Sequence, residues 1–193
     1  VRSGLLSRIS SGLEGSNFFI RGFCISAAFV VLSGIIELPW SIYSGWWREM
    51  SYGRTSQPIA DFLGQSGLGL ALNAVFMGLF FTAVYALIRW MGKLWWLWSG
   101  ALTASAIALL LLLGPIFIEP LFNEYNPVPE GEVKEAVEAL AIEANIPTDR
   151  IFMYDGSRQS NNFTANVSGI GSSARIAISD VALKEATLDE VKA

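Results

Sequence analysis

The sequence contains no histidine and a single cysteine, Cys24, and only 16% of its 193 residues are charged. One cysteine cannot form an intrachain disulfide, and without histidine neither a Cys/His zinc site nor a Ser/His/Asp catalytic set can be built from this chain. Basic residues are few and unclustered, and the formal net charge is −4. Nucleic-acid binding needs clustered Lys and Arg, so we expect no nucleic-acid partner.

Apolar residues, in contrast, are abundant. They make up 52% of the chain, and the mean hydropathy is +0.45. The charges are divided unevenly: residues 1–118 hold seven Lys and Arg against four Asp and Glu, whereas residues 119–193 hold six against thirteen. This division predicts that the first part lies in a lipid bilayer and the second part in water.

Three stretches in the first part are long and apolar enough to cross a bilayer, at residues 22–38, 67–88 and 94–118. A hydrocarbon core of about 30 Å needs roughly 20 helical residues. Pro39 is expected to end the first stretch, and the third is preceded by charged Lys93 and is itself free of charge. The sequence therefore predicts an integral, multi-pass membrane protein with a membrane region at residues 1–118.

The remaining residues have the pattern of an α+β segment. An amphipathic helix is predicted from Glu132 to about Asn145, followed by a strand at residues 151–154. Two extended segments, 163–167 and 174–179, flank a glycine-rich turn and predict a β-hairpin.

The end of the sequence predicts a further helix. Thr187 and Glu190 fit a capping box, in which Thr187 is the N-cap and Glu190 lies three residues later. The chain begins with Val1 and stops at Ala193 inside this predicted helix. We therefore expect it to be part of a longer protein.

Taken residue by residue, these segments assemble no catalytic site. Their order, however, resembles that of the integral-membrane zinc metalloproteases that include the CAAX prenyl endopeptidase. The motifs that carry the resemblance are L-P-W-S-I-Y at 38–43, P-L-F-N-E-Y-N-P at 120–127, P-E-G-E at 129–132, I-F-M-Y-D-G-S-R at 151–158, T-A-N-V-S-G at 164–169, R-I-A-I-S-D at 175–180 and L-D-E-V-K-A at 188–193. The resemblance covers roughly residues 35–193 and identifies the chain as similar to the N-terminal portion of that family.

The resemblance implies a transmembrane helical region followed by the α+β start of a zincin-like metalloprotease domain, at residues 119–193. In the family, the helix that begins like residues 188–193 continues into H-E-x-x-H, which binds Zn²⁺ and activates water. It implies that the intact protein hydrolyses peptide bonds of a prenylated or membrane-associated polypeptide near the membrane. It also implies that this portion alone lacks the zinc ligands and is inactive.

The substrate-binding residues implied by the resemblance are Thr164, Ala165, Asn166 and Val167. An edge strand beside the zinc helix pairs with the substrate backbone in this family, which is a form of β-augmentation. The family pattern N-A-[YF] maps onto residues 164–166, with Thr164 in place of Asn. Ala165 leaves room for the substrate backbone, and the Asn166 amide is placed to bind a peptide carbonyl. The alternative interpretation is an ordinary hairpin strand.

Two other functions remain open at this stage. One is a quality-control protease of the same family, which degrades misfolded membrane proteins. The other is a non-catalytic membrane scaffold. The presence of H-E-x-x-H in the protein would separate a protease from a scaffold.

Overall fold

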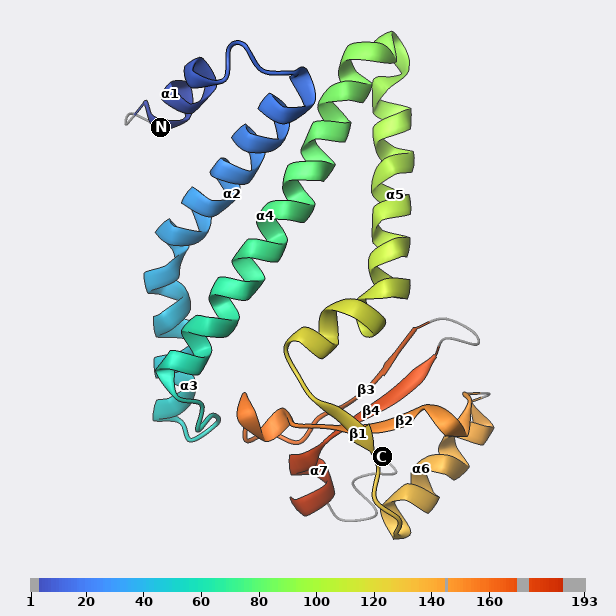
Figure 1. The fold of residues 1–193 in the computed structure, drawn as a ribbon. Coiled ribbons are helices and arrows are strands. Elements are labelled where there is room, and N and C mark those ends of the chain that lie inside the picture. Colours follow the sequence, from blue (N-terminus) through green and yellow to red (C-terminus); the bar gives the residue numbers. More distant parts are fainter. Residues whose placement is uncertain (1–3, 145, 170–173, 186–193) are drawn as a thin grey trace. The chain divides into compact units, whose positions relative to one another are not determined.

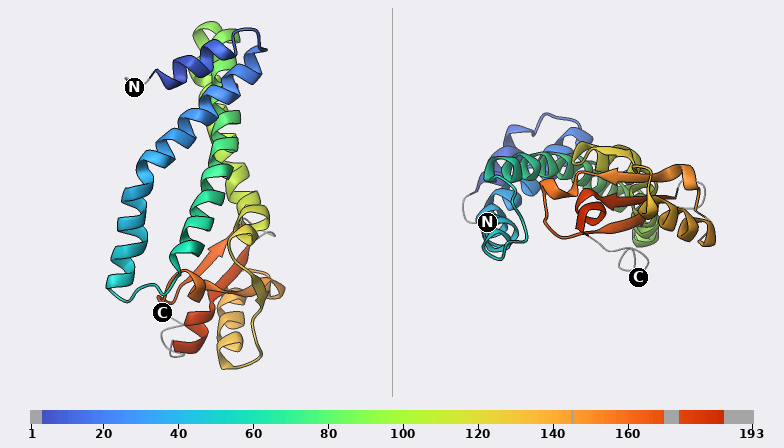
Figure 2. Two further views of the ribbon diagram at one scale, coloured as in Figure 1. Left: turned by 60° about the vertical axis from the view of Figure 1, so that its left-hand side comes forward. Right: turned by 90° about the horizontal axis from the view of Figure 1, so that it is seen from below.

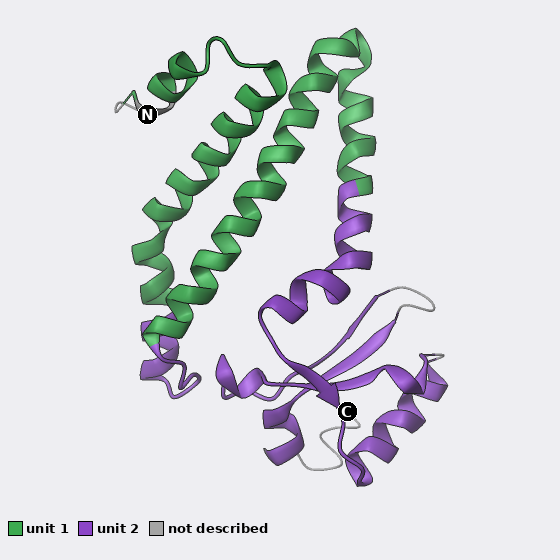
Figure 3. Cartoon of the chain, in the orientation of Figure 1, with its two compact units in different colours: residues 1–45, 59–105 green, residues 46–58, 106–193 purple. Residues whose placement is uncertain are grey.

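The computed structural model describes residues 4–144, 146–169 and 174–185. The chain divides into two compact units, one of residues 1–45 and 59–105 and the other of residues 46–58 and 106–193 (Figure 3). The sequence predicts a boundary at residue 118 between the membrane region and the start of the peptidase domain. The two compact units are defined in space and do not test that boundary, which stays a prediction.

Long helices make up the first unit (Figure 1). They are α1 at Leu5–Gly12, α2 at Phe18–Ser41, α4 at Ile59–Trp90 and the first part of α5 at Trp95–Leu113. Three helical segments are long and apolar enough to cross a membrane, at Phe18–Ser51, Ile59–Trp90 and Gly92–Leu121. Each of the three predicted apolar runs lies within one of these helical segments, and each segment is longer than its run. The bounds of the spans in a membrane stay a prediction.

The prediction that Pro39 ends the first span was wrong. Pro39 lies inside α2, and the helix passes into a π-helix, η1 at Ile42–Trp47, and then into α3 at Arg48–Ser51. Proline removes one N–H and crowds the carbonyl four residues earlier, so its effect falls on the turn before it, whereas the π-helix lies after it. In lipid an unbonded backbone group costs several kcal/mol, so the chain stays helical rather than breaking.

Small residues line the contact between α2 and α4. The buried positions of α4 recur every four residues, at Ala74, Gly78, Thr82 and Ala86. A Cβ atom added at Gly78 would lie 2.8 Å from the ring of Phe23 on α2. Transmembrane helices associate through such close packing because lipid supplies no hydrophobic drive between them.

The second unit contains a four-stranded sheet of order β1-β2-β4-β3. The strands are β1 at Tyr125–Pro127, β2 at Ile151–Tyr154, β3 at Ala165–Ser168 and β4 at Arg175–Ser179. The predicted strand at 151–154 and the antiparallel pairing of β3 with β4 are confirmed. β1, which pairs with β2, was not predicted. It has only three residues, one of them is proline, and a stretch rich in turn residues follows it directly.

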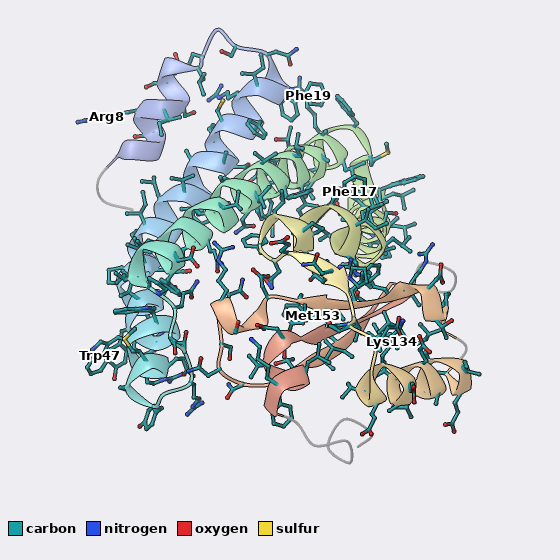
Figure 4. All side chains as sticks on the ribbon, turned by 60° about the horizontal axis from the view of Figure 1, so that its bottom comes forward. Arg8, Phe19, Trp47, Phe117, Lys134 and Met153 are labelled. Atoms are coloured by element: carbon teal, nitrogen blue, oxygen red, sulfur yellow. The ribbon has the colours of Figure 1, made fainter. Side chains whose placement is uncertain are left out.

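Two helices cover one face of this sheet, α6 at Glu132–Glu143 and α7 at Asp180–Glu185 (Figures 1 and 2). The core between them contains Val137 and Ala141 of α6, Ala182 of α7, and Ile176 and Ile178 of β4. Figure 4 shows the side chains of this layer, where Met153 marks β2 and Lys134 marks α6. Ile176 and Ile178 therefore lie on the face of β4 that these helices cover, while Ala177 on the other face is buried as well.

Some predicted features lie outside the described residues. These are the hairpin turn at 170–173 and the capping box of Thr187 and Glu190. The start of the family's zinc helix therefore stays a prediction.

Candidate substrate-binding strand

β3 is the last strand of the sheet. β4 pairs with one side of it, and among the described residues no strand pairs with its other side. Ala165, Asn166 and Val167 are exposed, and Val167 retains 61% of its accessible surface. An edge strand with accessible backbone groups is a template onto which an extended peptide can add as a further strand.

The hydrogen-bond pattern determines which backbone groups β3 presents at this edge. The N–H of Ser179 donates to the carbonyl of Thr164 over 2.8 Å, so this opposed pair is hydrogen-bonded. Bonded and non-bonded pairs alternate along an antiparallel ladder. Thr164, Asn166 and Ser168 therefore direct their backbone groups toward β4, whereas Ala165 and Val167 direct theirs toward the free edge.

The register also assigns the side chains to faces. Ala165 opposes Ile178 and Val167 opposes Ile176, so these side chains share the face of the sheet that α6 and α7 cover. Asn166 lies on the opposite face, opposite Ala177. The Asn166 side chain thus projects from that face of the sheet, at right angles to the backbone groups that Ala165 and Val167 direct toward the free edge.

Ser179, the last residue of β4, fixes the start of the candidate strand. Its hydroxyl accepts hydrogen bonds from the backbone N–H of Thr164 at 3.0 Å and of Ala182 at 3.2 Å. The residue is only 1% exposed. One buried oxygen therefore holds both the residue before β3 and the first turn of α7.

Asp180 holds the same corner from the other side. Its carboxylate accepts hydrogen bonds from the backbone N–H and the hydroxyl of Ser157, and it forms an ion pair with Lys184. Burial acts to raise the pKa of this carboxyl, but the Ser157 hydrogen bonds and Lys184 outweigh it and hold the pKa below its ordinary value. Asp180 is therefore ionised at neutral pH.

A half-buried charged cluster lies near the other end of β3. The Arg175 guanidinium pairs with Glu119, stacks 4.5 Å from the centroid of the Tyr125 ring, and donates to the Ser168 hydroxyl. Tyr125 donates its own hydroxyl hydrogen to Glu119 over 2.9 Å. Burial, together with this hydrogen bond to the Glu119 carboxylate, raises the pKa of Tyr125.

A cavity of about 480 Å³ lies beside the last residues of β3. Its walls are mainly apolar, from Leu110, Leu111, Pro115 and Ile118, with Glu119 as the charged member and residues 167–169 along one side. It places an apolar surface beside the end of the strand.

The described residues do not supply a metal site. Within residues 4–144, 146–169 and 174–185, no three His, Cys, Asp or Glu side chains are grouped so that they could hold a metal ion.

Several residues around β3 were not found from the sequence. Ser179, Gln159 and Asn161 all contribute hydrogen bonds there, and Thr55 does so from about a hundred residues earlier in the chain. Isolated polar residues in loops carry no periodic signal. For Ser179, the one signal in the sequence is its place at the end of an apolar segment.

Comparison with known proteins gives matches along almost the whole chain. Residues 3–124 match a family model described as CAAX prenyl protease N-terminal, five membrane helices, and residues 127–193 match peptidase family M48. A CAAX prenyl protease 1 homolog of Oryza sativa subsp. japonica is 27% identical over 98% of this chain and 44% of its own length. An uncharacterized metalloprotease of Bacillus subtilis is also 27% identical, over 98% of this chain and 45% of its own length.

Among solved structures, the crystal structure of S. mikatae Ste24p matches with a TM-score of 0.79 at 25% identity. The match covers 90% of this chain and 40% of that protein. The chain thus spans less than half the length of these relatives.

Proposed function

Because the chain belongs to peptidase family M48 and carries the CAAX prenyl protease N-terminal region, we propose that it is the N-terminal part of a membrane-embedded, zinc-dependent endopeptidase. The intact enzyme would hydrolyse peptide bonds of a polypeptide close to the membrane. The share of each relative that this chain covers supports its being one part of such an enzyme.

Zinc is implied for the intact protein by family membership, but the residues of this chain do not fit a zinc site. The sequence has no histidine, and the described acidic side chains form no metal-holding group. Zinc would supply the activated water for hydrolysis. The proposal therefore gives this chain a different task, which is to hold the polypeptide.

We assign that task to Thr164, Ala165, Asn166 and Val167. The observation that carries the assignment is the free edge of β3, where the N–H and carbonyl groups of Ala165 and Val167 point away from β4. A substrate strand would bond to these two residues. Thr164 would end the pairing, and the Asn166 side chain would bind a peptide carbonyl from its own face of the sheet.

The first test replaces Ala165 with Trp in the full-length protein and measures peptide cleavage in detergent or liposomes. We expect a large loss of kcat/KM, because an indole on this face of the sheet would crowd the side chain of the substrate residue that pairs with Ala165. Ala139→Trp is the matched control, since Ala139 is an exposed residue of α6. Equal cleavage by both variants and the wild type would contradict the assignment.

A second test changes the substrate instead of the enzyme. A peptide is N-methylated at one position at a time, which removes a single N–H donor. Because only alternate residues of β3 face the free edge, we expect cleavage to fall at alternate methylated positions. Uniform tolerance to methylation along the peptide would argue against strand addition. Loss of activity without this period would point to another binding mode.

A further inference from the structure

The loop between α3 and α4 contacts the segment that leads into β3. Both belong to the second compact unit, which contains residues 46–58. Thr55 donates its hydroxyl hydrogen to the carbonyl of Gln159 over 2.8 Å, and the N–H of Asn161 donates to the carbonyl of Arg54 over 2.8 Å. More than a hundred residues of sequence separate these partners.

Asn161 is the centre of this junction. Its side-chain Nδ2 donates to the carbonyl of Gly53 at 2.9 Å and lies 3.1 Å from the Ser56 hydroxyl, which in turn lies 3.2 Å from Oδ1. Together with its backbone N–H, which donates to Arg54, this one residue thus contacts three positions of the loop, Gly53, Arg54 and Ser56. No apolar side chain of the same size could replace these bonds.

The loop has a shape that presents its carbonyls for these contacts. α3 ends in a Schellman motif, in which the N–H of Gly53 donates to Met50 and the N–H of Arg54 donates to Glu49. Gly53 has φ of +69°, in the left-handed region that glycine adopts most easily. The resulting turn leaves the carbonyls of Gly53 and Arg54 free to accept from Asn161.

Thr55 stabilises the loop while it contacts its partner. Only 6% of its surface is exposed, and its hydroxyl accepts from the N–H of Gln57 at 3.1 Å while donating to Gln159. Gln159 is held a second time, because its side-chain amide donates to the Asn123 side chain over 2.6 Å. The segment 159–161 is therefore fixed from two directions.

This junction lies immediately before the candidate strand. Asn161 precedes Thr164 by three residues, and Thr164 is itself fixed by Ser179. We propose that Thr55 and Asn161 are positioning residues, which hold the segment before β3 so that the free edge of the strand is aligned for the polypeptide. This inference rests on the proposed function, because it identifies the residues that position the strand to which the proposal assigns substrate binding.

The test compares Asn161→Ala and Thr55→Val with the wild type in the full-length protein. Thr55→Val keeps the shape of the side chain and removes only its hydroxyl. We expect each variant to raise KM for a peptide substrate by about tenfold, since one or two net hydrogen bonds correspond to that factor. The kcat at saturating peptide should change by a smaller factor. Thr55→Ser, which restores the hydroxyl, should restore KM.

A second readout follows the strand itself. In the wild type, we expect an uncleavable peptide analogue that keeps all its backbone N–H groups to protect the amides of Ala165 and Val167 from hydrogen exchange. In Asn161→Ala this protection should be reduced at the same peptide concentration. A residue that only stabilised the fold would lower the melting temperature without changing this protection. Asn162→Ala is the control, because Asn162 is exposed and only its backbone N–H bonds at this junction in the described chain.

The outcomes separate the two proposals. If Ala165→Trp abolishes cleavage while Asn161→Ala and Thr55→Val keep the wild-type KM and protection, the positioning role is overturned and the assignment of β3 stands. If Ala165→Trp has no effect, both are overturned. Should Asn161→Ala fail to fold, Thr55→Val and Ser56→Ala decide the matter, and wild-type KM in both overturns the positioning role.

Discussion

The Ser179 hydroxyl lies 3.0 Å from the backbone nitrogen of Thr164, and the Ser179 nitrogen lies 2.8 Å from the Thr164 carbonyl oxygen. The side chain and the backbone of one buried residue therefore both hold the residue that begins the candidate substrate strand. The same hydroxyl caps the first turn of α7 through Ala182. The corner between β4 and α7 and the start of β3 thus share one oxygen atom.

Replacing Ser179 with Ala should destabilise this corner. Two backbone N–H groups lose their acceptor in a buried position, and one unsatisfied group costs about 1–3 kcal/mol. We expect a lower melting temperature and faster hydrogen exchange at the amides of Thr164 and Ala182. Ser51→Ala is a suitable control, because its hydroxyl is exposed and, among the described residues, bonds only to the carbonyl of Arg48 in the preceding turn. Unchanged exchange at both amides would contradict this account.

The sequence was informative where burial imposes a period. The spans, the helix at α6 and the strands β2 and β4 follow from apolar runs or alternation, and Ile176 and Ile178 point to the core as their spacing requires. The free edge of β3 was reached only through family resemblance, since three of its four residues are exposed and show no alternation of burial.

The rest depends on contacts between distant parts of the chain. The sequence around Thr55 does not indicate that its hydroxyl bonds to Gln159, because a threonine hydroxyl can donate to a carbonyl anywhere in the chain. The continuation of α2 through Pro39 was missed for a different reason. Local propensity disfavours proline inside a helix, but the need to bond every backbone group in lipid outweighs that preference.

Gly78 provides a test of helix packing in the first unit. A Cβ there would meet the Phe23 ring at 2.8 Å, whereas a Cβ at Gly69 on the same helix would meet no atom within 4 Å. We therefore expect Gly78→Ile to separate α2 from α4 and to lower stability by about 1–3 kcal/mol, as overpacking does. Gly69→Ile should have little effect. Thermal unfolding in detergent, with both variants measured in parallel, checks the difference.

Asp180 should make stability depend on pH in the acid range. Its folded pKa is below its unfolded value, so its contribution is complete above the unfolded pKa of about 3.9 and is lost as the pH falls through the folded pKa. Asp180→Asn should therefore be less stable than the wild type at pH 7. The difference in melting temperature between the two should shrink as the pH is lowered below about 4.

A variant of Ser157, the hydrogen-bond partner of Asp180, tests the same interaction. Because Ser157 donates to Asp180 from both its hydroxyl and its N–H, Ser157→Ala removes one of the two bonds. Its effect should be smaller than that of Asp180→Asn, and the two should not add in the double variant. Additive effects would mean that Asp180 is stabilised by other groups.

The Arg175–Glu119 pair should contribute more to stability than an exposed pair. The side chains of Arg175 and Glu119 are 13% and 30% exposed, and Arg175 also covers the Tyr125 ring. Arg175→Gln leaves a partly buried carboxylate with fewer donors, which should cost about 1–3 kcal/mol. The control is Lys184→Gln: that side chain is 71% exposed in its pair with Asp180, and its loss should cost at most about 1 kcal/mol.

In a double-mutant cycle, adding Glu119→Gln to Arg175→Gln should restore part of the loss, because the unpaired charge is then removed. A double variant as unstable as the sum of the single ones would show that Arg175 acts through its packing on Tyr125 and not through Glu119.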